Sequence, residues 1–219
     1  MGALFLIAMV TSLVGATLID SILSAPDYLA NVSANRTTVT GGVFLELING
    51  IAVIGIAVLM YPLFKKQNEA LATGYVALRI MESVAIVAAV VSPLSLIALS
   101  QDYVKAGASA ATHLEAVGAS LLAERALWVG AMIGIFFGLA ALPFFWGLFR
   151  SRLVPRYISI WGLLAAVSVL TWNLLEFFGI SVSFGMILAL PIIVNEVFLA
   201  IWLIVKGFNP SAIASPSAT

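Results

Sequence analysis

Residues 127–149 read LWVGAMIGIFFGLAALPFFWGLF, a stretch that contains no charged side chain. A helix needs about 20 predominantly apolar residues to cross the hydrocarbon core of a bilayer. This stretch is long and apolar enough, so we expect it to form a transmembrane helix. Basic residues flank it, with Arg125 shortly before it and Arg150 directly after it.

Five further stretches meet the same criterion and consume most of the chain. The six predicted spans cover residues 3–22, 42–64, 71–99, 127–149, 157–178 and 182–205. The third is long for one crossing, and Pro93 is expected to kink or end it. The sequence therefore predicts an all-α integral membrane protein with a single six-helix domain over residues 1–208. The tail, residues 209–219, is expected to be disordered.

The composition supports this class and excludes several others. Of the 219 residues, 63% are hydrophobic and 9% are charged, whereas soluble domains have about 25% charged residues. Ten basic residues balance ten acidic ones, so we expect no nucleic-acid partner, which would need clustered cations. The chain has no cysteine and a single histidine, His113. We therefore expect no metal site and no cofactor.

The distribution of Lys and Arg predicts the orientation, because cytoplasmic loops are enriched in both residues. One side has Lys65, Lys66, Arg150, Arg152, Arg156 and Lys206, and the other has Arg36, Lys105 and Arg125. We expect the first side, with both termini, to face the cytoplasm, in the inner (cytoplasmic) membrane of a prokaryote. The aromatic belt expected at this interface comprises Tyr61, Tyr75, Trp146, Tyr157 and Trp202.

Two sequence patterns predict helix packing. In residues 101–125, an apolar stripe that includes Leu114 and Leu121 predicts an amphipathic helix. It would lie on the outer membrane face, or pack on the bundle as a loop helix. Gly130, Gly134 and Gly138 recur every four residues, so they share a face that a neighbouring backbone can approach closely. That neighbour would be another helix of this chain or, less readily, a second copy.

Charged residues within predicted spans form a first candidate site. Arg79 and Glu82 are three apart on the third span, so they share a face, and Glu196 lies at a similar depth on the sixth beside Asn195. Such charges are costly in a membrane and usually find partners in the bundle interior. Two interpretations stay open: an ion triad that sets the register of the two helices, or a binding site for a polar headgroup or a proton-coupled element.

A second candidate cluster lies toward the outer leaflet. It comprises three acids and two amides without an assigned basic partner: Asp20, Glu46, Asn49, Asn173 and Glu176. This composition suggests water access or a cationic ligand. The alternative is that acids near helix ends, such as Asp20 and Glu46, lie in the headgroup region.

Several enzyme classes are excluded by the residues present. His113 lies in a predicted loop, not on a late span as a rhomboid-type protease requires, and no Asp lies mid-membrane as an aspartyl protease requires. No phosphate-binding Gly-Lys-Ser/Thr loop appears. We therefore assign no catalytic residue. A lipid-modifying enzyme with Glu46 and Glu176 as acid and base stays as a remote alternative.

Several segments from the second span onward form a pattern typical of one known family. They are residues 78–82 (LRIME), 135–139 (IFFGL), 149–156 (FRSRLVPR), 160–165 (IWGLLA) and 195–207 (NEVFLAIWLIVKG). With these segments the chain resembles a family of bacterial multi-pass membrane proteins, domain of unknown function 4386. Two charged positions of the family map onto the Arg79-x-x-Glu82 motif and Glu196. The chain departs from the family pattern in lacking basic residues before the first span. The resemblance implies the topology and no known activity.

These patterns favour a protein that binds or transports a lipid or small amphipathic molecule at the buried Arg/Glu cluster. The alternative is a structural or regulatory membrane subunit that acts through helix contacts. The expected partners are the lipid bilayer and that ligand, with a second copy of the chain or another membrane protein as further options.

Overall fold

The structure is a computed structural model that describes residues 1–106 and 108–214. Within these ranges it contains helices and no strand. Six helical stretches are long and apolar enough to span a membrane. The all-α, six-span architecture predicted from the sequence is therefore confirmed.

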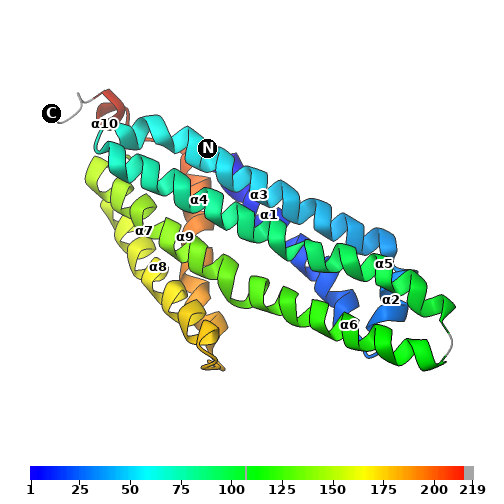
Figure 1. Cartoon of the computed structure of the whole chain (residues 1–219). Coiled ribbons are helices and arrows are strands. Elements are labelled where there is room, and N and C mark those ends of the chain that lie inside the picture. Colours follow the sequence, from blue (N-terminus) through cyan, green and yellow to red (C-terminus); the bar gives the residue numbers. More distant parts are fainter. Residues whose placement is uncertain (107, 215–219) are drawn as a thin grey trace.

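The described helices follow one another in a simple order (Figure 1). They are α1 (Gly2–Leu23), α2 (Tyr28–Ala34), α3 (Arg36–Lys65), α4 (Glu69–Ala89), α5 (Val91–Lys105), α6 (Ala108–Leu127), the π-helix η1 (Trp128–Met132), α7 (Ile133–Ser151), α8 (Arg156–Phe177), α9 (Gly185–Val205) and α10 (Pro210–Ala214). The pair α4 and α5 forms one long span, and α6, η1 and α7 form another.

Proline accounts for the interruption of the third span. A proline in a helix interior lacks the N–H that bonds to the fourth residue before it, and its ring clashes with that residue's carbonyl. For Pro93 this residue is Ala89, the last residue of α4, and α5 begins at Val91. The break lies where Pro93 was predicted to place it, and it leaves the Ala89 carbonyl without its helical donor.

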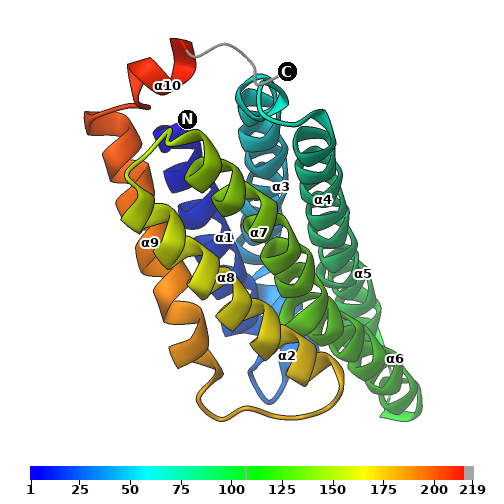
Figure 2. The ribbon, with the colours of Figure 1, turned by 90° about the vertical axis from the view of Figure 1, so that its left-hand side faces the viewer.

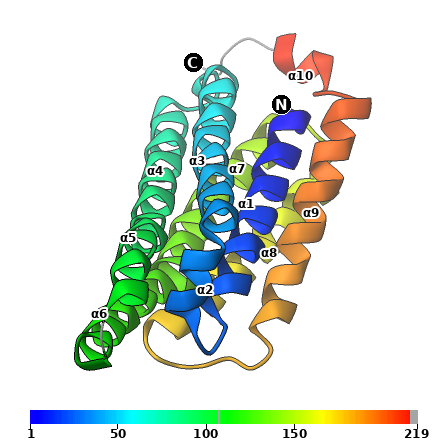
Figure 3. The same ribbon diagram turned by 90° about the vertical axis from the view of Figure 1, so that its right-hand side faces the viewer.

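The six spans are arranged as a closed ring. In ring order, α1 packs on α3, α3 on α4, α4 on α7, α7 on α8, α8 on α9, and α9 again on α1 (Figures 2 and 3). Near the N-terminus, α1 and α9 approach so closely that a Cβ on Gly2 would overlap the carbonyl oxygen of Ala200. Side chains from all six spans can therefore meet inside one enclosure.

The ring has an aromatic core near the end where the N-terminus lies. Phe5 of α1, Phe64 of α3, Tyr75 of α4 and Phe144 of α7 are buried, and the rings of Tyr75 and Phe144 stack with centroids 5.4 Å apart. Edge-on and stacked aromatic contacts of this kind add to the apolar burial. This core closes one end of the enclosure.

Two of the spans are too long to lie within the bilayer. The helix Ala110–Ser151 has 42 residues, about 63 Å at 1.5 Å per residue, against a hydrocarbon thickness of about 30 Å. Even at a tilt of about 40° it would extend about 48 Å along the membrane normal. In contrast, α8 and α9 have 22 and 21 residues and match the bilayer.

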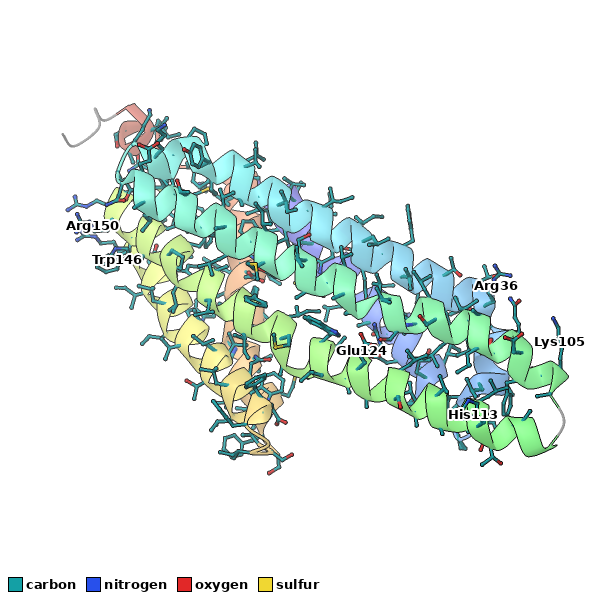
Figure 4. The ribbon with its side chains drawn as sticks, viewed as in Figure 1. Arg36, Lys105, His113, Glu124, Trp146 and Arg150 are labelled. Atoms are coloured by element: carbon teal, nitrogen blue, oxygen red, sulfur yellow. The ribbon has the colours of Figure 1, made fainter. Side chains whose placement is uncertain are left out.

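The excess length lies in α5 and α6, which run on past the ends of α8 and α9 (Figure 1). We call α2, α5, α6 and the adjoining ends of α1 and α3 the head. Arg36, Lys105 and His113 lie at this end of the molecule, and Trp146 and Arg150 lie at the opposite end (Figure 4). A charged, projecting head and an apolar ring are the two parts that position the sites.

The head has a small hydrophobic core of its own. Leu29 and Val32 of α2 are buried against Leu96 and Ile97 of α5. The Tyr28 hydroxyl donates to the Glu115 carbonyl of α6 at 3.1 Å. The short helix α2 therefore clamps the α5–α6 hairpin to the ends of α1 and α3.

The structure tests two predictions for segments outside the spans, the amphipathic helix in residues 101–125 and the disordered tail, residues 209–219. Of residues 101–125, Gln101–Lys105 complete α5, and the part from Ala108 onward belongs to α6, which packs on α5. The structure thus favours the packed helix over a separate helix on the membrane face. The expectation of disorder is wrong for Pro210–Ala214, which form α10, and residues 215–219 lie outside the described residues.

Candidate functional site

Arg79, on α4, is held by three neighbours in the interior of the ring. Its Nη1 donates to Oε2 of Glu82 at 2.8 Å, one turn along the same helix, and its Nε donates to the Tyr75 hydroxyl at 3.2 Å. The guanidinium also lies 5.5 Å from the centre of the Tyr75 ring and 5.6 Å from that of Phe137 on α7. With both ring contacts and a charge-assisted bond, the Arg79–Glu82 pair is a compact, largely neutralised unit.

Tyr75 was expected in the interfacial aromatic belt, and this is wrong. The Tyr75 side chain is fully buried. It lies four residues before Arg79, so both share the helix face that points into the ring. That spacing was the signal that sequence reasoning missed. Tyr75 is part of the Arg79 site.

Glu196 joins the site from α9. It lines the same cavity as Arg79 and Glu82 and lies within electrostatic range of both. Among the described residues it has no hydrogen bond or ion pair, and its side chain is partly exposed. The adjacent Asn195 points elsewhere, because consecutive helix residues lie about 100° apart. Its Nδ2 donates to the Ile158 carbonyl of α8 at 3.0 Å, so Asn195 fastens α9 to α8 and does not belong to the charge cluster.

A cavity of about 430 Å³ lies inside the ring at these charges. Its polar lining consists of Ser12, Asn49, Arg79, Glu82, Asn173 and Glu196. Aromatic and aliphatic side chains form the remainder, with Phe137 and Trp172 among them. A mostly apolar pocket with a few convergent polar groups is the usual form of a small-molecule site.

The cavity is partly open, and its opening is apolar. Three of its lining residues are also exposed on the outside of the bundle: Leu13 of α1 at 54%, Val129 of η1 at 36% and Met186 of α9 at 68%. These side chains belong to α1, η1 and α9, so the exposed part of the cavity lining is apolar.

The outer cluster predicted from the sequence separates into three groups. Asn49 and Asn173 line the cavity. Glu176 accepts from the Trp172 indole N–H at 3.3 Å and from the Val182 backbone N–H at 3.0 Å, so it orders the connection between α8 and α9. Asp20 and Glu46 form the third group, with a partner that the sequence analysis did not assign.

That partner is Arg125, at the end of α6. Its Nη2 lies 2.9 Å from Oε1 of Glu46 on α3 and 3.3 Å from Oδ1 of Asp20 on α1. Arg125 and Glu46 are buried, whereas the Asp20 side chain is half exposed. The expectation that these acids lack a basic partner is therefore wrong, because Arg125, at the end of the predicted amphipathic helix, is buried between the helices.

Arg125 has a third acceptor that follows from the break in the third span. Its Nη1 lies 3.3 Å from the Ala89 carbonyl oxygen, the group that Pro93 deprives of a helical donor. One guanidinium thus bonds to α1, α3 and the end of α4. It satisfies a buried carbonyl and a buried carboxylate together.

The three glycines predicted to share one helix face, Gly130 of η1 and Gly134 and Gly138 of α7, have different surroundings. A Cβ on Gly134 would overlap the Asn173 carboxamide, and one on Gly138 would lie 2.8 Å from Cβ of Leu170, so both pack on α8. A Cβ on Gly130 would meet nothing within 4 Å. The π-turn Trp128–Met132 interrupts the four-residue periodicity here. Gly130 and Gly134 both line the cavity, but only Gly134 also packs closely on α8.

The arrangement is suited to binding more than to acid–base chemistry. Glu46 is paired with Arg125 and Glu176 with Trp172, and neither lines the cavity. Glu82 is paired with Arg79. Glu196 is thus the one carboxylate lining the cavity that has no hydrogen-bonding partner among the described residues.

A protein-family model matches nearly the whole chain. The family model described as Domain of unknown function (DUF4386) matches residues 1–207, which include α1 as well as the spans from α3 onward. No curated protein and no solved structure matches the chain.

Proposed function

Since this chain belongs to the family described as Domain of unknown function (DUF4386), we propose that it binds or transports a lipid or small amphipathic molecule inside its ring of helices. The polar part of the ligand lies beside Arg79, Glu82 and Glu196, and the apolar part extends toward the opening. The proposal concerns binding first, since transport requires in addition that the ligand leave on another side.

The observation that carries this proposal is the polarity gradient of the cavity. Its inner wall has the charges on α4 and α9, whereas Leu13, Val129 and Met186 surround its opening. A fully polar ligand gains nothing from the apolar opening, and a wholly apolar one gains nothing from buried charges that are costly to maintain. An amphipathic molecule matches both ends.

Substitutions at two glycines test this proposal. Gly130 lines the cavity and has open space at its Cβ, so Gly130→Trp should fill the opening without a backbone clash. Gly74 also has open space at its Cβ but does not line the cavity, which makes Gly74→Trp the matched control. Native mass spectrometry of the purified proteins would compare co-purifying lipids and amphiphiles.

We expect a discrete bound mass on the wild type and on Gly74→Trp that is depleted on Gly130→Trp. Equal occupancy of all three proteins would show that the ligand lies elsewhere. If the wild type binds no lipid or amphiphile from a panel of added compounds, the proposal fails.

A second candidate function is a structural or regulatory membrane subunit, and the projecting head favours it. The α5–α6 hairpin extends past α8 and α9 (Figure 1) and exposes Val104 at 61% and Val117 at 39%, a surface that another membrane protein can contact. Crosslinking from single sites on the head in native membranes tests this function. Recovery of no protein partner counts against it.

For location, we propose the inner membrane of a prokaryote with both termini in the cytoplasm. The basic residues at the end opposite the head support this orientation. Arg150 lies at that end, whereas Lys105 lies at the tip of the head (Figure 4). The head would then project from the outer face.

A further inference from the structure

The charges in the cavity are not equally available to a ligand. Arg79 is 2% exposed, it is paired with Glu82, and aromatic rings lie close to its guanidinium. An anionic headgroup would have to displace Glu82 or insert between the guanidinium and a ring. Arg79 is therefore a poor receptor for an anion.

Glu196 is available where Arg79 is not. It lines the cavity, is partly exposed to it, and has no donor among the described residues. One carboxylate is thus present in excess of the single guanidinium. Asn49 lines the same cavity, is 9% exposed, and likewise has no hydrogen bond within the described part of the chain. The carboxylate attracts any cationic headgroup by its charge, and the amide oxygen of Asn49 accepts a hydrogen bond where that headgroup has an N–H.

Aromatic rings supply a further preference for a cation. Phe137 and Trp172 line the cavity on α7 and α8. The faces of aromatic rings attract ammonium groups, and tryptophan is the strongest of the aromatic side chains in this respect. The Trp172 N–H is already bonded to Glu176, which holds the indole in place.

From these three features we infer that the ligand is a cationic amphiphile, a protonated or quaternary amine with an apolar tail, and that Glu196 is the residue that selects it. This inference rests on the proposed function and adds the charge of the headgroup. The excess carboxylate binds the ammonium, the ring of Trp172 lies beside it, and the tail passes between Leu13 and Met186. An anionic amphiphile is rejected, because it would lie against an unpaired carboxylate.

Three photoreactive probes with the same diazirine-bearing alkyl chain test this inference. Their headgroups are trimethylammonium, sulfonate and hydroxyl. Each is added to the full-length protein in zwitterionic nanodiscs, and mass spectrometry of peptides measures saturable labelling of residues that line the cavity. The variants are Glu196→Gln and, as a matched control, Glu69→Gln, which removes an exposed carboxylate whose pairing with Lys65 is at the surface.

We expect the trimethylammonium probe to label the cavity with an apparent affinity about tenfold or more above that of the other two probes, because the Glu196 carboxylate and the Trp172 ring attract its charge. Glu196→Gln should remove this advantage, and Glu69→Gln should retain it. Trp172→Leu is a second variant that keeps the test decisive if Glu196→Gln does not fold. Trp172→Leu should lower the apparent affinity of the trimethylammonium probe about three- to tenfold and leave that of the hydroxyl probe unchanged.

The contrary outcomes separate the two proposals. Saturable cavity labelling that favours sulfonate, or that is the same for wild type and a folded Glu196→Gln, overturns the cationic assignment and leaves the amphiphile site in place. Absence of saturable labelling by all three probes overturns both the assignment and the proposed function.

Discussion

Arg125 lies 2.9 Å from Glu46, although 79 residues separate them in the sequence. This buried ion pair joins α6, the main helix of the head, to α3 of the ring. The same guanidinium reaches Asp20 on α1 and the Ala89 carbonyl that Pro93 leaves free. One side chain therefore connects a helix of the head to three helices of the ring.

Arg125→Met should destabilise the protein by about 3–5 kcal/mol, because it leaves the Glu46 carboxylate buried without a counter-charge. The free energy of unfolding measured by titration with SDS in mixed micelles tests this expectation. Arg36→Met is the matched control: Arg36 is exposed at the start of α3 and has no ion pair among the described residues, so its loss should change stability by less than about 0.5 kcal/mol.

The double variant Arg125→Met, Glu46→Leu separates charge from packing. Replacing both members of a buried ion pair by apolar side chains is often neutral, so the double variant should be more stable than Arg125→Met alone. If Arg125→Met unfolds like the wild type, the ion pair does not hold the junction. If the double variant is the less stable one, the cost arises from lost shape and not from an unpaired charge.

Gly134→Ala and Gly130→Ala should differ, although the two glycines are one predicted turn apart. Gly134→Ala places a methyl group against the Asn173 carboxamide and should lower the stability of the folded protein by about 1–3 kcal/mol. The second meets open space and should stay within about 1 kcal/mol of the wild type. Thermal unfolding of both variants in one detergent makes the comparison. Equal losses would mean that the π-turn does not separate the two positions.

Local sequence patterns predicted much of this structure. Apolar stretches identified six spans because a membrane helix must be about 20 residues long and apolar. Helical spacing placed Arg79 and Glu82 on one face, and they form an ion pair. Both inferences concern residues within one helix, where the periodicity of the helix determines neighbours.

Contacts between helices were not predictable in this way. Arg125 was assigned to the end of an amphipathic helix outside the spans because the predicted span began at residue 127, whereas α6 runs from Ala108 to Leu127 and leads directly into η1 and α7. Reading that helix through Arg125 would have suggested a buried role, but not the identity of Glu46 as partner. The predicted outer cluster separates into three groups in the structure for the same reason, because the spacing of residues along one helix does not show which neighbouring helix each of them faces.

Tyr75→Phe tests whether the phenol stabilises the charged site. Its hydroxyl accepts from Nε of Arg79 in a fully buried position, and a buried hydrogen bond to a charged group contributes about 1.5–3 kcal/mol. We therefore expect Tyr75→Phe to lower the free energy of unfolding by about this amount. Tyr157→Phe is the control, because Tyr157 is 56% exposed and donates no hydrogen bond among the described residues. Equal stability of Tyr75→Phe and wild type would show that the hydroxyl is dispensable.

The orientation in the membrane can be measured directly, because the chain has no cysteine and any introduced one is unique. Glu69→Cys places a thiol at the start of α4, at the end opposite the head, and His113→Cys places one on the exposed surface of α6. Neither change alters the Lys and Arg distribution that sets the orientation. The reagent is a membrane-impermeant maleimide applied to intact cells with a permeable outer membrane.

We expect His113→Cys to react in intact cells and Glu69→Cys to react only after the inner membrane is opened. The reason is that basic residues near the α3–α4 and α7–α8 connections should retain that side in the cytoplasm, with the head outside. The reverse pattern would place the head in the cytoplasm and overturn the proposed orientation.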